Sequence, residues 1–343
     1  MMGNTMNASA AASAITTTLH NQQQHPHPPH QHHNHKTCGG GDGARFIWHS
    51  SSQLFSTSSS SSSSSPSALP EEEEAAPEAR LIQTSVEHVV AITLSRPQKK
   101  NALGNKLVSQ LEAIVKQATE MPQQEARVLI LHSDVPGVFC AGADLKERKG
   151  MSIDDVREFV SRLRALTDAI DSLPMPTIAA LDGVALGGGL EMALACDLRV
   201  AGPEAKVALP EVRLGIIPGA GGTQRLSRVV GYSRACDLTF SGRRVNANEG
   251  VSMGLFSECA EQDASVFPAY ERALKMASDI AQGAPLALRA AKRAIRASGG
   301  VHGKVCDGMA AEADAYELVL HSSDRVEALE AFAEKRKPTF EGR

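Results

Sequence analysis

The 343-residue chain has few aromatic residues and no strong excess of charge of either sign. Its 35 basic and 39 acidic residues give a formal net charge of −4, which argues against a dedicated nucleic-acid binder. Long apolar runs are also missing, and a membrane-spanning helix needs about 18 consecutive apolar residues. The most apolar stretch, Thr177 to Cys196, is interrupted by Asp182 and Glu191, so the sequence predicts no membrane span.

Cysteines are few, with six in the chain, and none forms a CxxC pair. That scatter argues against a disulfide scaffold and favours a reduced intracellular compartment. The P-loop pattern and the G-x-S-x-G elbow are absent, and Met192 stands where a dinucleotide fingerprint begun at Gly187 needs its third glycine. These absences argue against nucleotide-binding loops and a serine hydrolase. Cys140 has no evident histidine partner, which predicts a buried core residue rather than a nucleophile.

Residues 1–70 differ in composition from the rest of the chain. Seven of the twelve histidines fall between His20 and His35, and eight serines run from Ser58 to Ser65. Such a segment buries too little apolar surface to offset its ordering entropy. A Ser-rich leader with one acidic residue, Asp42, resembles an organelle transit peptide, which predicts a mitochondrial matrix location. The alternative is a disordered tail without an address. Residues 71–80, with four consecutive glutamates, are predicted to be a linker.

Strand and helix patterns alternate after the linker. Residues 89–94, 128–132, 177–181 and 197–201 indicate strands. Apolar residues at helical spacing indicate a helix over 103–118 that Pro122 ends, and a second helix over 156–170 that Ser152 and Asp155 begin as a capping box. This order predicts an α/β core over 81–268. From 269 to 343 the pattern is helical, at 273–281, 285–298 and 308–320, which predicts a separate helical region.

Three turns rich in small residues carry the chemistry-bearing side chains. They span 139–146 (FCAGADLK), 182–191 (DGVALGGGLE) and 209–223 (LPEVRLGIIPGAGGT). Small residues let a ligand approach the backbone, and free N–H groups at a helix start can hold an oxyanion. Glu191 and Glu211 add one carboxylate each, among apolar neighbours. Taken singly, each turn also fits a structural role, with glycines for close packing and carboxylates facing a helix dipole or solvent.

Together these segments resemble the crotonase superfamily, and within it the enoyl-CoA hydratases. The resemblance runs from about residue 82 to 342 and adds LSRP (94–97), NAL (101–103), ACDLR (195–199), GTQRL (222–226) and FAEKRKPTF (332–340). Residues 139–148 and 186–200 are most similar to the methylglutaconyl-CoA hydratase type, also described as an AU-rich RNA-binding homologue. The resemblance implies a spiral of ββα repeats followed by C-terminal helices that build homotrimers, often paired as homohexamers.

The resemblance also implies roles for the three turns. The substrate would be a 2-enoyl thioester of coenzyme A, whose carbonyl oxygen is held by the backbone N–H groups of Ala143 and Gly188. Glu191 would activate a water and Glu211 would deliver a proton to Cα, with the roles exchanged in the reverse direction. Coenzyme A is then part of the substrate, and neither a metal nor a further cofactor is implied.

The coenzyme A carrier is expected to run along 96–103 and 141–146. The expected contacts are Arg96, Lys100, Ala102, Leu103, Ala141, Asp144, Leu145 and Lys146. Lys100 and Lys146 are candidates for the carrier phosphates, although both lysines also fit a solvated surface.

The sequence leaves several alternative reactions and substrates open. Relatives with one of the two carboxylates tend to be isomerases, hydrolases or dehalogenases, so having both favours a hydratase. Straight-chain enoyl-CoA of fatty-acid β-oxidation and branched methylglutaconyl-CoA of leucine breakdown both remain possible substrates. RNA binding is disfavoured, because the positions expected to be lysines in the resembled type are Asn105, Ser109 and Ala113 here. A catalytically inactive assembly subunit is disfavoured by the presence of both glutamates.

Overall fold

A computed structural model describes residues 76–262, 264–298 and 305–343 of the chain, without the side chains of residues 305–307. The predicted leader over 1–70 and the first half of the predicted linker lie outside the described residues. The described chain enters a sheet at β1 (Ala79–Gln83), before the predicted end of the linker.

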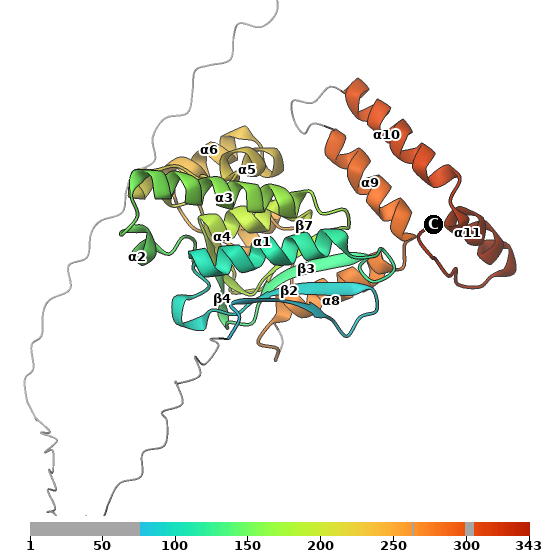
Figure 1. The fold of residues 1–343 in the computed structure, drawn as a ribbon, viewed down its shortest axis with the longest axis horizontal. Coiled ribbons are helices and arrows are strands. Elements are labelled where there is room, and N and C mark those ends of the chain that lie inside the picture. The colour runs from blue at the N-terminus through green and yellow to red at the C-terminus, as the bar shows by residue number, and fades with distance from the viewer. Residues whose placement is uncertain (1–75, 263, 299–304) are drawn as a thin grey trace, which may run out of the picture. The chain divides into compact units, whose positions relative to one another are not determined.

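Two sheets form the core of the described region (Figure 1). The larger sheet has the order β1-β2-β3-β5-β7-β10, and the smaller has the order β4-β6-β8-β9. Neighbouring strands are parallel except for the β1–β2 and β8–β9 pairs. The remaining strands are β2 (Val89–Leu94), β3 (Val128–Ser133), β4 (Gly137–Cys140), β5 (Thr177–Leu181), β6 (Gly183–Leu186), β7 (Leu198–Ala201), β8 (Lys206–Ala208), β9 (Val245–Asn246) and β10 (Glu258–Cys259).

Consecutive strands divide between the two sheets, which produces a spiral. In the pairs β3–β4, β5–β6 and β7–β8, the first strand joins the larger sheet and the second joins the smaller one. A helical segment follows each pair before the chain returns to the larger sheet. This arrangement confirms the α/β spiral of ββα repeats. The short strands of the smaller sheet were not predicted, because three or four residues hold too little alternation to read.

The central strands are buried on both faces, which explains their nearly continuous apolar sequences. Side chains on one face of β2 and β3, such as Ile92 and Leu131, join the core beneath α1 (Asn105–Glu120) and α3 (Ile153–Asp171). The alternate side chains, such as Ala91 and Ile130, pack on the alanines of α8 (Pro268–Ala281). Asp182 receives hydrogen bonds from the Ala269 and Tyr270 N–H groups, so this acidic break in the apolar stretch caps α8.

The predicted helices lie where their periodicity placed them. α3 begins with the predicted capping box, in which Ser152 and Asp155 exchange hydrogen bonds. α8, α9 (Pro285–Ala297) and α10 (Val305–Leu320) confirm that the C-terminal segment is helical, although α8 packs on the larger sheet and is not separate from the core. Shorter or less regular helices were not predicted, namely α2 (Leu145–Arg148), α5 (Gly222–Val230), α6 (Tyr232–Ser241), α7 (Ala247–Ser252), α11 (Ser323–Glu334) and the 3₁₀ turns η1 (Pro97–Lys99) and η2 (Glu211–Leu214).

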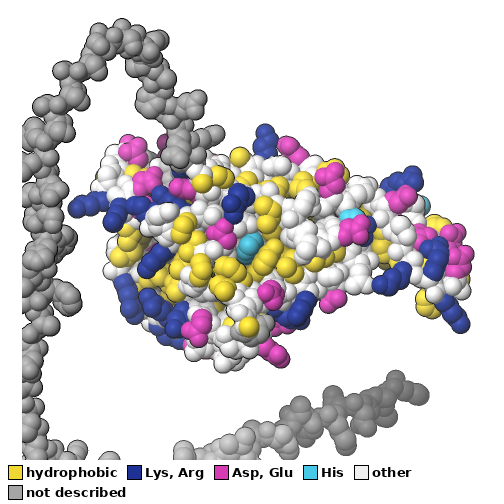
Figure 2. Space-filling view, turned by 90° about the horizontal axis from the view of Figure 1, so that it is seen from below, with side chains coloured by type: hydrophobic (Ala, Val, Ile, Leu, Met, Phe, Trp, Pro, Cys, Tyr) yellow, Lys and Arg dark blue, Asp and Glu magenta, His cyan; other side chains and the backbone are white. Residues whose placement is uncertain are grey.

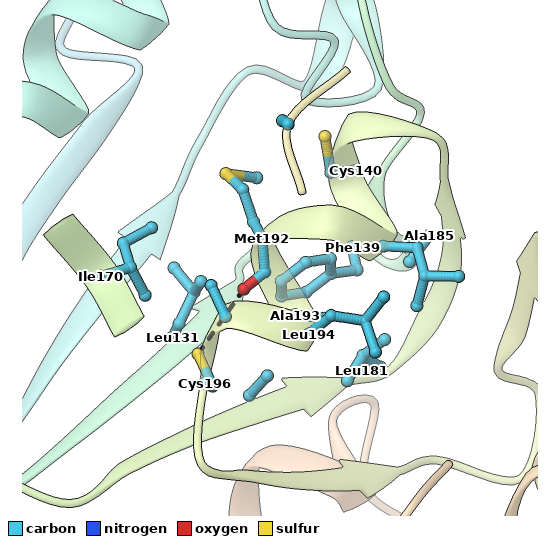
Figure 3. Packing of buried hydrophobic residues seen from close by; sticks show 14 of the residues in the cluster. Leu131, Phe139, Cys140, Ile170, Leu181, Ala185, Met192, Ala193, Leu194 and Cys196 are labelled. Carbon is cyan, nitrogen blue, oxygen red and sulfur yellow. Dashed lines mark hydrogen bonds between the residues drawn. The ribbon is translucent and has the colours of Figure 1, made fainter. Parts of the chain in front are cut away.

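The helix α4 (Gly188–Ala195) lies inside the core, with every residue from Gly189 to Ala195 buried. Figure 3 shows Met192 and Leu194 of this helix beside Phe139 of β4 and Leu131 of β3. A Cβ atom added at Gly189 would lie 2.5 Å from the Cys140 carbonyl oxygen and 2.8 Å from the Cys140 Cβ. Glycine therefore allows the start of α4 to approach the end of β4 closely.

Replacing Gly189 with alanine is expected to lower the free energy of unfolding by about 1–3 kcal/mol, because the backbone of β4 must shift. Urea unfolding of the whole chain would measure this loss. The matched control is Gly150→Ala, since a Cβ there meets its nearest neighbour at 3.8 Å. An unfolding midpoint equal to that of the control would contradict the close packing of α4 on β4.

Arg127 connects the C-terminal segment to the core. Its guanidinium donates hydrogen bonds to the carbonyl oxygens of Ala281 and Phe340, 3.0 and 2.8 Å away.

None of the helices in the described ranges is both long and apolar enough to cross a membrane. Figure 2 shows hydrophobic side chains gathered on one face of the molecule, with charged side chains around them. Large apolar side chains exposed on α10 and α11 are Met309, Tyr316, Leu318, Val326, Leu329 and Phe332.

Candidate active site

The three turns singled out in the sequence line one cavity of about 620 Å³. Its floor and walls come from the turn before α2, the start of α4, the η2 turn and the loop before α5. Exposed or partly buried apolar side chains of α3 and of residues 214–217 make up much of the remaining wall. The lining includes Ala143, Gly188, Glu191 and Glu211, so the cavity brings together all four residues predicted to carry the chemistry.

Two backbone N–H groups at the cavity wall lack an acceptor. Gly188 is the first residue of α4, where no intrahelical acceptor exists. Ala143 lies in a parallel bridge with Leu103, but the bonds of that bridge use the N–H groups of Leu103 and Asp144. Within the described residues, neither the Ala143 nor the Gly188 N–H donates a hydrogen bond. Both can therefore bind an oxygen atom of a ligand.

The Ala143 turn is held in place by the segment 96–103. Asn101 is fully buried with a left-handed φ of 53°, and its Nδ2 donates to the Ser133 hydroxyl and the Phe139 carbonyl at 2.7 and 2.9 Å. The Ala141 N–H donates to the Lys100 carbonyl. Gly142 has a φ of 91°, and a Cβ there would lie 2.8 Å from the Leu186 carbonyl oxygen. The first two turns thus approach each other at backbone distance.

Two of the predicted carrier contacts pair with each other. The Arg96 guanidinium lies 3.4 Å from the Asp144 carboxylate and 3.1 Å from Glu78. The same Asp144 carboxylate accepts hydrogen bonds from the Lys146 and Glu147 N–H groups and so caps α2. Both side chains are therefore engaged in shaping the Ala143 turn.

The other predicted carrier contacts fall into three groups. Lys100 and Lys146 are exposed, while Ala102 and Leu103 are buried behind the cavity wall. Ala141 and Leu145 line the cavity itself. The structure therefore brings Ala141 and Leu145 to the cavity surface and leaves Lys100 and Lys146 exposed outside the cavity lining.

The Glu191 carboxylate is buried and anchored. Its Oε1 atom accepts hydrogen bonds from the Ala220 and Gly222 N–H groups, both at 2.8 Å. Burial raises the pKa of Glu191, and those two N–H groups oppose the rise. A Cβ on Gly222 would lie 2.9 Å from the same oxygen, so glycine is required for this close approach. The loop before α5 therefore fixes the position of the carboxylate and leaves its second oxygen available.

The Glu211 carboxylate is buried but not anchored in the same way. Its Oε2 atom has no hydrogen-bond partner among the described residues, which is rare for a buried oxygen. Burial raises the pKa of Glu211 to about 7, and the charge of Glu191 adds to the rise. Near neutral pH this carboxyl can therefore both hold and release a proton.

Gly187 directly precedes α4 and lies against the Glu211 carboxylate. Its φ is 50°, and a Cβ at this position would lie 2.8 Å from Glu211 Oε1. A side chain here would displace the carboxylate and strain the backbone. The glycine run 187–189 thus has three separate uses: room for Glu211, a free N–H at Gly188, and the contact of Gly189 with β4.

Two arginines in the cavity wall were not identified from the sequence. Arg148 ends α2, and Arg164 lies on α3 four residues after Val160 and eight after Val156, which also line the cavity. The i, i+4, i+8 spacing placed Arg164 on the same helix face as these valines, and this signal could have located it. The apolar face predicted for this helix included Val156 and Val160 together with Leu163 and Leu166, but Arg164 was not assigned to it.

Cys140 is buried, as predicted, and burial raises the pKa of its thiol to about 12. A thiol held protonated in the core is a poor nucleophile. No cluster of three or more His, Cys, Asp or Glu side chains within the described ranges has a geometry suited to a metal ion. The chemistry-bearing groups of this cavity are thus carboxyl groups, guanidinium groups and backbone N–H groups.

Comparisons with known proteins agree on one family. The sequence pattern of the family described as Enoyl-CoA hydratase/isomerase matches residues 84–343. The chain is 46% identical over 256 residues to "Probable enoyl-CoA hydratase 2, mitochondrial" of Arabidopsis thaliana, covering 74% of this chain and 82% of that protein. It is 45% identical over 254 residues to the human "Methylglutaconyl-CoA hydratase, mitochondrial", covering 74% of each. The crystal structure of an enoyl-CoA hydratase from Bacillus anthracis is similar, with a TM-score of 0.72 and 42% identity over 78% of this chain and all of that one.

Proposed function

Because the chain belongs to the enoyl-CoA hydratase/isomerase family, the crotonase family resembled by its motifs, we propose that it adds water across the 2,3 double bond of an enoyl-CoA thioester. The single observation that carries the proposal is the cavity in which two buried carboxyl groups accompany two backbone N–H groups that have no acceptor in the described part of the chain. A hydration needs a group to activate water, a group to protonate Cα, and donors for the thioester oxygen. Glu191 and Glu211 supply one carboxyl group for each proton transfer, and Ala143 and Gly188 supply the two donors for the oxygen.

The N–H groups of Ala143 and Gly188 would hold the thioester oxygen. Charge builds on this oxygen when water adds to Cβ, so donors fixed beforehand stabilise the enolate-like transition state. The start of α4 adds the positive end of a helix dipole to the Gly188 donor. Because the donors belong to the backbone, the adjacent positions can stay small and leave room for the thioester.

The two glutamates would share the added water. Glu191, anchored by the Ala220 and Gly222 N–H groups, would accept a proton from the water as it attacks Cβ. Glu211, whose Oε2 atom has no hydrogen-bond partner among the described residues, would give a proton to Cα. In dehydration each residue performs the opposite transfer. The two proton transfers require no redox cofactor. With only one carboxyl group, one of the two transfers would have no acid or base to assist it.

Hydration is expected to fall as the pH rises through about 7. Glu211, whose pKa burial raises to about 7, must be protonated to act as the acid, so kcat/KM for hydration declines on the alkaline side. Because hydration releases no net proton, its equilibrium constant does not depend on pH, and kcat/KM for dehydration must follow the same pH profile. Measuring kcat/KM for hydration from pH 5 to 9 in the wild type and in Glu211→Gln tests the assignment. An alkaline decline near pH 7 that persists in Glu211→Gln would count against Glu211 as the proton donor.

The direct test of the proposal follows the loss of enoyl-thioester absorbance when purified protein meets crotonyl-CoA. Turnover to 3-hydroxybutyryl-CoA is the expected result. Absence of turnover across crotonyl-CoA, longer enoyl-CoA thioesters and methylglutaconyl-CoA, by protein that is folded and binds acyl-CoA, would contradict the hydratase assignment. Formation of a 3-enoyl thioester would indicate an isomerase instead.

The cellular setting is also a proposal. Relatives that the chain matches are named mitochondrial, and the Ser-rich leader supports import to the matrix. A hydratase there would serve fatty-acid β-oxidation or leucine breakdown. The exposed apolar side chains of α10 and α11, among them Phe332 at 83% exposure, support assembly into a homotrimer or homohexamer. Sedimentation of the purified chain would measure that state.

RNA binding is not part of the proposed function. On α1, Asn105 and Ser109 contact the Arg162 side chain of α3 through hydrogen bonds of 3.3 and 2.8 Å. Asn105 also bonds the Glu147 carboxylate. This part of the helix is therefore engaged with neighbouring elements, and it carries neutral residues where a phosphate-binding face would need lysines.

A further inference from the structure

The cavity holds two cations in addition to the two carboxyl groups. Arg148 and Arg164 both line it, in a wall otherwise composed of apolar side chains such as Val156, Val160 and Ile216. An enoyl chain made only of CH₂ and CH₃ groups gains nothing from a guanidinium group, which loses hydration when such a chain covers it. The two arginines therefore need a reason beyond the proposed hydration.

Neither Arg148 nor Arg164 forms an ion pair with a carboxylate within the described ranges. Other arginines of α3 behave differently, since Arg157 pairs with Asp154 and Arg162 pairs with Glu112. Arg148 instead lies over the Phe159 ring, with its Cζ atom 6.0 Å from the ring centroid. Both guanidinium groups thus keep hydrogen-bond donors available to a ligand.

The position of Arg164 favours the acyl side of the cavity over the carrier side. Its Nε atom donates to the Gly219 carbonyl at 3.2 Å. Gly219 directly precedes Ala220, whose N–H group anchors Glu191. The charge of Arg164 also acts on Glu191, where it opposes the effect of burial on the carboxyl pKa. The Arg164 cation therefore lies on the side of the cavity where the 219–222 loop anchors Glu191, whereas the carrier is expected along residues 141–146.

The charge of the cavity points to the same ligand class. In the proposed hydration Glu191 is ionised and Glu211 is protonated, so the two arginines leave the cavity with a net positive charge. An acyl chain with a carboxylate at its far end would neutralise that excess. Guanidinium groups pair with carboxylates through charge-assisted and often bidentate hydrogen bonds, which are about twice as strong as neutral ones.

We propose that Arg164, together with Arg148, binds a carboxylate at the far end of the acyl chain, so that the preferred substrate is the monothioester of an unsaturated dicarboxylic acid. This inference rests on the proposed hydratase function and names its substrate class. Arg164 and Arg148 are then specificity-determining residues, and the apolar side chains of the same cavity contact the carbons that join the two ends of the diacid.

The test compares two five-carbon substrates that differ at one end. Glutaconyl-CoA carries a terminal carboxylate, and trans-2-pentenoyl-CoA carries a methyl group at the same place. The wild-type kcat/KM is expected to be at least about tenfold higher for glutaconyl-CoA. Arg164→Met should lower the ratio of the two values by about tenfold or more, since a hydrogen bond to a charged group contributes about 1.5–3 kcal/mol. Arg164→Lys should keep part of the preference, and Arg148→Met should lower it further.

Two controls separate this role from others. Arg157→Met removes a cation from the same helix outside the cavity, where the side chain is 72% exposed, and should leave both rates unchanged. Inhibition by the saturated thioesters glutaryl-CoA and pentanoyl-CoA measures binding without turnover. Arg164→Met should weaken glutaryl-CoA much more than pentanoyl-CoA, even if a loss of the Arg164 charge near Glu191 slows both reactions.

Each contrary result has a distinct meaning. Equal losses for both substrates in the arginine variants would show that the cations contact the coenzyme A carrier, and would overturn the proposal. A wild-type preference for pentenoyl-CoA would overturn it as well. If neither thioester is hydrated, the hydratase function itself fails, while the inhibition constants still report whether Arg164 recognises a carboxylate.

Discussion

Glu211→Gln is expected to lower kcat for hydration by about 10²–10⁴-fold, because an amide cannot give a proton to Cα. Glutamine has nearly the same shape, so KM for crotonyl-CoA should change much less than kcat. Steady-state kinetics at pH 7, with the enoyl absorbance as the signal, would measure both constants. In Glu211→Gln, the decline of the hydration rate above pH 7 should be absent, because the group that loses its proton there has been removed.

The control for this variant is Glu204→Gln, which makes the same chemical change at an exposed residue outside the cavity. Its kinetics should match those of the wild type. An unchanged rate in Glu211→Gln would remove Glu211 from the mechanism, leaving a single carboxyl group.

Unfolding measurements test whether the low rate reflects misfolding. Burial raises the pKa of Glu211 from its ordinary 4.5 to about 7, so the folded chain binds the proton more tightly than the unfolded chain does. Stability therefore falls as the pH rises from about 4.5 to about 7. Glutamine cannot ionise, so Glu211→Gln should lack this loss and should be no less stable than the wild type at pH 8. A clear drop in its urea midpoint at pH 8 would instead indicate a structural role.

Gly188→Pro is expected to lower kcat/KM by about 10²–10³-fold or more, because proline removes the N–H group proposed to hold the thioester oxygen. Gly188 is the first residue of α4, and the first helical position is where proline is best tolerated. The change therefore replaces the N–H donor of residue 188 with the proline ring, while the hydrogen bonds within α4 are kept. Single-turnover hydration of crotonyl-CoA would measure the effect on the chemical step.

Gly188→Ala is the matched control. A Cβ at this position would lie 2.8 Å from the Leu103 Cδ1 atom, so both variants need the same small movement of a leucine side chain. Only the alanine variant keeps the N–H group. A rate in Gly188→Pro within a few-fold of Gly188→Ala would mean that this N–H group does not stabilise the transition state.

Local features of the chain could be predicted because they depend on neighbours in the sequence. The strands at 89–94, 128–132 and 177–181 are buried on both faces, and their unbroken apolar sequences made them visible. The capping box of Ser152 and Asp155 located the start of α3. The family followed from motif order, and the match over residues 84–343 confirms it.

Other features depend on segments that are far apart in the chain. Sequence reasoning assigned Asp144 and Arg96 to the carrier, and only the fold shows that they pair with each other. Asp182 interrupts an apolar stretch for no local reason, and its use is to cap α8, 87 residues later. The raised pKa of Glu211 likewise results from burial by elements that its own turn does not specify.

The sequence by itself determined which chemical groups are available: two glutamates, three turns rich in small residues and an α/β order of elements. Only the tertiary structure decided that these groups share one cavity and that Arg164 faces it as well. The physical reason is that helix periodicity shows which residues lie on the same side of α3, but not what covers that side. The loop before α5 contains Gly219, which lies 55 residues after Arg164 and accepts its hydrogen bond. This loop packs against α3, so Val156, Val160 and Arg164 line the cavity that holds the two glutamates.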